Sequence, residues 1–131
     1  MDFTNYGAEQ TLRWVLGQTA QAPPTLFFVA LHIGDPGPDG VDNPAGETLR
    51  VEYVPDTIDV TGGGTGEAFV LNTGDINWEN LAATETISDV SIWDALTGGN
   101  AWYKGALVAA VGVIAGGNFQ FLDQNGQIKH D

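Results

Sequence analysis

The first part of the chain has the apolar spacing of an amphipathic helix. One face carries apolar side chains at intervals of three and four residues, at Ala8, Leu12, Val15 and Leu16. Asn5 is the expected N-cap and Gly17 the expected end, because glycine readily takes the left-handed conformation that closes a helix. The pattern predicts a helix over residues 6–16, followed by a break at Pro23 and Pro24.

After the two prolines the pattern changes to that of β-strands. Residues 25–33 form a nearly continuous apolar run, which is typical of a strand buried on both faces. Residues 48–54 alternate between apolar and polar side chains, and short apolar runs then recur between turn residues, about every 8–12 residues. One short helix and about eight strands favour a mainly β protein, an antiparallel β-sandwich (jelly-roll or immunoglobulin-like) or small barrel, forming a single domain over residues 1–131.

Two turns and one glycine-rich loop interrupt these strands. Residues 96–100, Leu-Thr-Gly-Gly-Asn, predict a hairpin turn with Trp93 and Trp102 on opposite arms. Residues 124–126, Gln-Asn-Gly, carry the strongest short signal for a second hairpin. Residues 61–67, TGGGTGE, resemble a phosphate loop only in their glycines. They lack the following Lys-Ser or Lys-Thr and the following helix, so they predict a flexible connection between strands.

The hairpin tryptophans are candidates for an interface. Val90 and Ile92 share one face of their strand, so Trp93 points outward if those two residues enter the core. An outward tryptophan is usually covered by a loop, by the N-terminal helix or by a partner chain. The candidate interface residues are Trp14, Trp93, Trp102 and Tyr103.

Acidic residues outnumber basic residues by 17 to 4, which gives a formal net charge of −13. Phosphate binding needs clustered cations, whereas Arg13, Arg50, Lys104 and Lys129 are scattered singly along the chain. We therefore exclude DNA, RNA and anionic membranes as partners. The acidity has three open explanations: solubility at high local concentration, a salty habitat, or a site for divalent cations.

No group of residues has the spacing of a catalytic site. The chain has no cysteine, no Gly-x-Ser-x-Gly motif, no apolar run of membrane-spanning length and no secretion-signal pattern at its start. His32 lies in an apolar strand, where a histidine is more often a hydrogen-bonded structural side chain than a base, and His130 is the penultimate residue. We expect no enzymatic activity and no cofactor.

The acidic loop at residues 34–47 is a weak candidate for a metal site. Its possible ligands are Asp35, Asp39, Asp42 and Glu47. The EF-hand pattern needs an acid or amide at its third position and a glutamate at its twelfth, where this loop has Gly37 and Gly46. An exposed acidic loop without bound metal is therefore favoured over a calcium site.

Several segments in the same order resemble a family of small tailed-bacteriophage virion proteins, commonly labelled phage tail fibre protein. The similar segments are NYGAEQTLRWVLGQTAQAPPTLFFVALHIGDPG near the start, INWEN, and SIWDALTGGNAWYKGAL. The resemblance covers residues 5–36, 72–80 and 87–122. The chain departs from the family in its longer acidic loop at 38–47 and after Asp123. The resemblance implies a structural protein of the virion, without catalytic residues.

Three functional hypotheses follow from the resemblance and the residues together. We favour a decoration (cement) protein on the capsid surface, bound to the major capsid protein or another virion protein and assembled as a homo-oligomer, with a trimer preferred. A tail-fibre or head-spike component that contacts the host is the alternative. A carbohydrate-binding module is the third hypothesis, because exposed tryptophans on a β-sandwich can stack on sugar rings.

Overall fold

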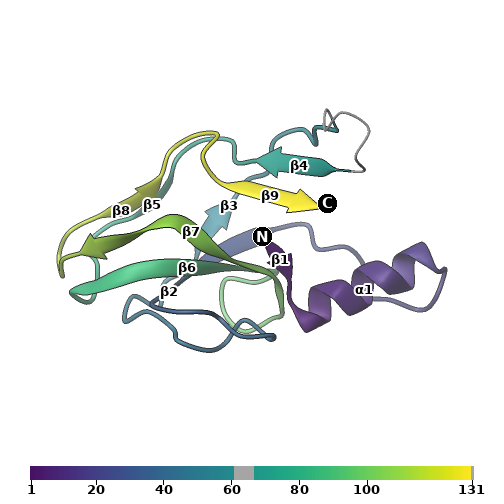
Figure 1. Ribbon diagram of the computed structural model, residues 1–131, viewed down its shortest axis with the longest axis horizontal. Coiled ribbons are helices and arrows are strands. Elements are labelled where there is room, and N and C mark those ends of the chain that lie inside the picture. The colour runs from purple at the N-terminus through teal and green to yellow at the C-terminus, as the bar shows by residue number, and fades with distance from the viewer. Residues whose placement is uncertain (61–66, 131) are drawn as a thin grey trace.

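The computed structural model describes residues 1–60 and 67–130, which form an antiparallel β fold with one helix (Figure 1). The helix is α1, Asn5–Val15. The strands are β1 Asp2–Phe3, β2 Phe27–His32, β3 Val51–Tyr53, β4 Ala68–Leu71, β5 Ile76–Trp78, β6 Glu85–Trp93, β7 Ala101–Val113, β8 Phe119–Phe121 and β9 Gln127–His130. The predicted mainly β class with one short N-terminal helix is confirmed. The predicted connection at 61–67 falls almost wholly on residues 61–66, outside the described part of the chain.

The strands form two layers around the apolar core. One layer is a five-stranded sheet in the order β1-β7-β6-β2-β3, and the other consists of two ribbons, β4-β9 and β5-β8. Every strand pair is antiparallel. Val29 and Ile92 of the sheet share one buried cluster with Trp78 and Phe119 of the ribbon β5-β8. This packing agrees with the expected sandwich, with the second layer divided into two ribbons.

The helix begins one residue earlier than its sequence indicates. The N-cap is Thr4 and not Asn5, since the Thr4 hydroxyl accepts a hydrogen bond from the Gly7 amide at 3.1 Å. The Thr4 amide also donates to the carbonyl of Trp102 in β7 at 3.0 Å, which fixes the start of the helix against the sheet. Gly17 follows the helix with a φ of 68°, as expected for a glycine end. No helix among the described residues is long and apolar enough to span a membrane.

The helix packs through a face other than its apolar stripe. Gly7 and Gln10 are its buried residues. By contrast, Leu12, Val15 and Leu16 are exposed. The spacing of these apolar residues therefore predicts the helix correctly but does not identify the side that contacts the rest of the chain.

The apolar run at 25–33 forms β2, which is buried on both faces as predicted. Leu31 and His32 are successive residues and point to opposite faces, yet they are only 2% and 3% exposed. The strand formed from the alternating run at 48–54 is shorter than expected, because only Val51–Tyr53 pairs with β2. Leu49 lies before this strand and is half exposed, while its carbonyl accepts a hydrogen bond from the indole of Trp78 at 2.8 Å.

The hairpin predicted around residues 96–100 is present. Strands β6 and β7 pair across it, and the register passes from Ile92↔Tyr103 to Trp93↔Ala101, so Trp102 is an extra residue in the ladder. The two tryptophans are therefore not cross-strand partners, although they lie on opposite arms of the same hairpin.

The second predicted hairpin, at residues 124–126, is wrong. Strand β8 pairs with β5 and strand β9 pairs with β4, so the Gln-Asn-Gly segment connects two ribbons. Asn72 determines this course. Its side-chain oxygen accepts from the Gly126 amide at 2.6 Å and its backbone oxygen from the Gln124 amide at 3.0 Å. These contacts, made to a residue distant in sequence, replace the local pairing that the Asn-Gly signal predicts.

Candidate interaction surfaces

Trp93 faces away from the main core but is covered by its own chain. The guanidinium of Arg50 lies 3.8 Å from the centre of the Trp93 ring. The same guanidinium donates to the carbonyls of Ala95 and Gly98, at 2.8 and 2.7 Å. The Trp93 indole donates to the hydroxyl of Ser91 at 2.7 Å, and only 8% of the residue is exposed. Arg50 therefore joins the β2-β3 connection to the hairpin turn and covers the outward tryptophan.

Trp102 is covered by helix α1. Its ring stacks on Trp14 with centroids 5.4 Å apart and meets the edge of Tyr6 at 5.2 Å. The Trp102 indole donates to the carboxylate of Asp94 at 3.0 Å. Trp102 is 3% exposed, whereas Trp14, on the outer side of the stack, is 37% exposed. Of the two stacked residues, only Trp14 offers a substantial surface to a partner.

Tyr103 connects the two ends of the described chain. Its ring stacks on Phe3 of β1 at 5.1 Å, and its hydroxyl is hydrogen-bonded to the Nε2 of His130 in β9 at 2.8 Å. Burial raises the pKa of Tyr103. Tyr103 is half-buried, and its contacts give it a structural role where β1 and β9 meet β7.

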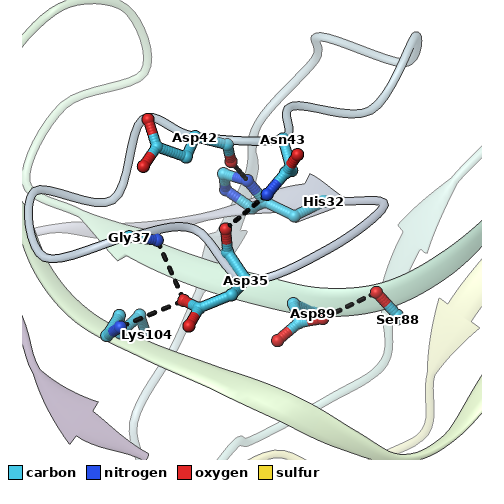
Figure 2. A network of polar contacts seen from close by, with 8 residues as sticks. All are labelled: His32, Asp35, Gly37, Asp42, Asn43, Ser88, Asp89 and Lys104. Carbon is cyan, nitrogen blue, oxygen red and sulfur yellow. Dashed lines mark hydrogen bonds and ion pairs between the residues drawn. The ribbon is translucent and has the colours of Figure 1, made fainter.

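The acidic loop is fixed by hydrogen bonds to the protein (Figure 2). The Asp35 carboxylate accepts from the Gly37 amide at 2.9 Å and from the Lys104 ammonium at 3.0 Å. The pKa of Asp35 is lowered, first by the Gly37 amide and then by Lys104. His32 lies beneath the loop, with Nδ1 hydrogen-bonded to the Asp42 carbonyl at 2.8 Å and Nε2 to the Ser91 hydroxyl at 2.7 Å. Both ring nitrogens of this buried histidine thus have partners, as a structural role requires.

Three of the four acidic candidates for a metal site, Asp35, Asp39 and Glu47, accept hydrogen bonds from different donors of the protein. Asp39 accepts from the Asn5 side chain at 3.3 Å. Glu47 accepts from the backbone amides of Leu49 and Ala82, at 3.1 and 2.9 Å. In Figure 2 the Asp42 carboxylate lies away from that of Asp35. Within residues 1–60 and 67–130, no group of three or more His, Asp or Glu side chains has the arrangement of a metal site.

A second surface, which was not expected from the sequence, is formed by residues 106–115, and we call it the outer segment. It comprises the distal part of β7 and the two residues after it, and it reads ALVAAVGVIA without a single polar side chain. Val108 is fully exposed and Ile114 is 71% exposed. An apolar run of this length was a signal for an interface, because an uninterrupted run loses the polar alternation expected of a strand with one face in water.

An apolar groove of about 590 Å³ lies beside the outer segment. Its walls include Ala106 and Val108 of β7, Ile92 of β6, and Phe119 and Phe121 of β8. The groove thus opens between the five-stranded sheet and the ribbon β5-β8. The two ends of strand β7 therefore have different surroundings. Its first residues are covered by α1 and β1, whereas its distal residues border an open apolar groove.

Comparison with known proteins identifies one family. The family described as "Podophage GP4 fiber I protein gp80" matches residues 2–129. This range includes the helix, both layers of the fold and the outer segment. No curated protein matches the chain.

Proposed function

The chain belongs to the family of the podophage GP4 fiber I protein gp80, a phage fibre and virion structural protein family, and we propose that it is a non-catalytic subunit of a virion fibre. The observation that carries this proposal is the extent of the family match, which covers residues 2–129. Because nearly the whole chain is matched, the similarity extends over the complete fold of this chain and is not limited to one motif.

The state of the reactive side chains supports a structural role. His32 has both ring nitrogens hydrogen-bonded and is 3% exposed, so it is not free to exchange protons with a substrate. Arg50 is engaged by two backbone carbonyls and by the Trp93 ring. These side chains connect loops to strands, which is a structural role and not a catalytic one.

A decoration protein on the capsid surface, bound to the major capsid protein, is the second candidate. The observation in its favour is the formal charge of −13 on 131 residues. Strong like charge keeps copies soluble when many are displayed at high local density. The family description names a fibre, and for that reason the fibre is our first proposal.

The structure removes the observation on which the hypothesis of a carbohydrate-binding module was based. It requires tryptophans with an open ring face, but Trp93 and Trp102 are 8% and 3% exposed. Trp14 is more exposed, yet one face of its ring is stacked on Trp102. We therefore do not propose sugar binding at these residues.

Location and copy number on the particle test the proposal. Antibody fragments against the purified chain are bound to intact virions and imaged by electron microscopy, while quantitative mass spectrometry counts the copies. A fibre subunit gives label at the fibres and few copies per particle, whereas a decoration protein gives label over the whole capsid and hundreds of copies. Absence of the chain from purified particles would contradict both assignments.

A further inference from the structure

The outer segment presents an apolar strand edge with little cover from its own chain. β1 pairs with β7 only at Tyr103 and Lys104, opposite Phe3 and Asp2. Beyond Lys104, no described strand pairs with this edge of β7, whose other side is occupied by β6. The backbone N–H and C=O groups on the free side are then available to pair with a strand from another chain.

The same edge carries an apolar protrusion. The register of β6 and β7 passes from Asp89↔Ala106 to Ile87↔Val111, so two steps along β6 correspond to five steps along β7. Residues 107–110 consequently bulge out of the ladder. Val108, within this bulge, is fully exposed.

The protrusion lies next to the apolar groove, which has room for the same protrusion of another copy. The groove of about 590 Å³ is lined by Val108 itself, by Phe119 and by Phe121. When a protrusion and a groove adjoin on one surface, two copies related by a two-fold axis can each insert into the other, which is an isologous contact.

The outer segment is a place where a second copy of this chain can bind despite the negative charge that both copies carry. Each copy carries a formal charge of −13, so most orientations of two copies bring carboxylates together. The outer segment contains no charged residue, which allows two copies to meet there without burying a carboxylate. An identical unpaired edge also supplies the strand partner that each copy lacks.

We propose that the outer segment, residues 106–115, is a self-association surface at which β7 edges of two copies pair and Val108 of each enters the groove of the other. The proposal rests on the proposed function in one respect, since a fibre subunit occurs in several copies. The proposal concerns association of the purified chain, however, so its failure would not contradict the proposed location of the chain on the particle.

Sedimentation equilibrium of the full-length chain over a range of concentrations tests this proposal. We expect the wild-type chain to associate and Val108→Asp to weaken association more than about tenfold, because each contact would bury an unpaired carboxylate. The matched control is Val60→Asp, the same change at another exposed valine (72% exposed), which should leave association unchanged. Melting curves of both variants at low concentration should equal the wild-type curve, since neither side chain is buried in one copy.

Cysteine cross-linking tests the specific contact, because the chain has no cysteine of its own. Val108→Cys and Gln120→Cys are purified separately, mixed and oxidised mildly. Gln120 borders the groove, so we expect a Val108–Gln120 cross-link between copies, and none when Val60→Cys replaces Val108→Cys. A wild-type chain that stays monomeric at every concentration, or a Val108→Asp variant that associates like the wild type, overturns the proposal. Failure of the mixed cross-link overturns the insertion of Val108 into the groove.

Discussion

Strand β7 contains a well-covered apolar region at one end and, at the other, the most exposed large apolar side chain of the described residues. Its first residues belong to the hairpin end, by which we mean Trp93, the turn at 94–100 and Trp102, where every aromatic ring is covered by Arg50 or by α1. Its distal residues form the outer segment, where Val108 is fully exposed beside an apolar groove. The difference shows that apolar side chains on one strand stabilise a single copy only where a neighbouring element of that copy covers them.

The largest difference between the two regions is expected in stability. Changing Trp102 to Ala should lower the free energy of unfolding by about 3–5 kcal/mol, because a buried ring in contact with Tyr6 and Trp14 is lost. Val108→Ala in the outer segment should change it by less than about 0.5 kcal/mol. Urea unfolding of both variants at low protein concentration measures the difference. Equal effects would mean that the hairpin end is no better packed than the outer segment.

Two glycines give a second comparison. A Cβ on Gly7 would overlap the backbone carbonyl of Trp102, whereas a Cβ on Gly112 would meet no atom within 4 Å. Gly7→Ala should therefore cost about 1–3 kcal/mol through overpacking. Gly112→Ala should be neutral or stabilise by about 0.4–1 kcal/mol. Thermal melts of the two variants check these signs, and a stable Gly7→Ala protein would show that the helix can move away from β7.

Acid should affect the interior but not the outer segment. Burial lowers the pKa of His32, with Asp89 opposing the shift and Arg50 adding to it. The unfolded chain keeps a histidine pKa near about 6.5, so protons favour unfolding below that pH. Stability should fall as the pH drops from about 6.5 towards the lower folded pKa, by at most about 1.4 kcal/mol per pH unit. Urea unfolding at about pH 7.5 and 5.5 measures the loss.

A second histidine provides the control for this experiment. Burial and the positive N-terminus also lower the pKa of His130. The pH dependence should decrease more in His32→Gln than in His130→Gln, because His32 is buried and His130 is exposed. The reverse result would assign the acid sensitivity to the chain terminus. Because the outer segment contains no titratable side chain, self-association should change little over the same range.

The smallest effect should come from salt. Repulsion between copies of charge −13 opposes association and is screened over about 10 Å at about 0.1 M salt. Association should strengthen a few-fold as salt rises from about 10 mM to about 200 mM, as followed by light scattering. Magnesium should add little beyond its ionic strength. The opposite trend would indicate that carboxylates dock on a basic surface, because such contacts weaken with salt.

The sequence determined those features whose causes are local. The spacing of Leu12, Val15 and Leu16 specified a helix, because helical geometry is set by residues within one turn. The turn at 96–100 was also predictable, since its closing contacts join neighbours: the Asn100 amide donates to the Asp94 carboxylate at 2.8 Å. The structural role expected of His32 agrees with the partners that it finds.

The tertiary structure decided which surfaces are covered, because coverage depends on residues far apart in sequence. Asn72, 54 residues before Gly126, turned an expected hairpin into a connection between ribbons. Arg50 converted the outward Trp93 from a candidate interface into a buried residue. The outer segment lies beyond the pairing of β1 with β7, in which Asp2 lies opposite Lys104, and no other described strand pairs with that edge. Local periodicity fixes how a segment folds, whereas its neighbours in space determine whether an apolar face is buried within one copy or left for another.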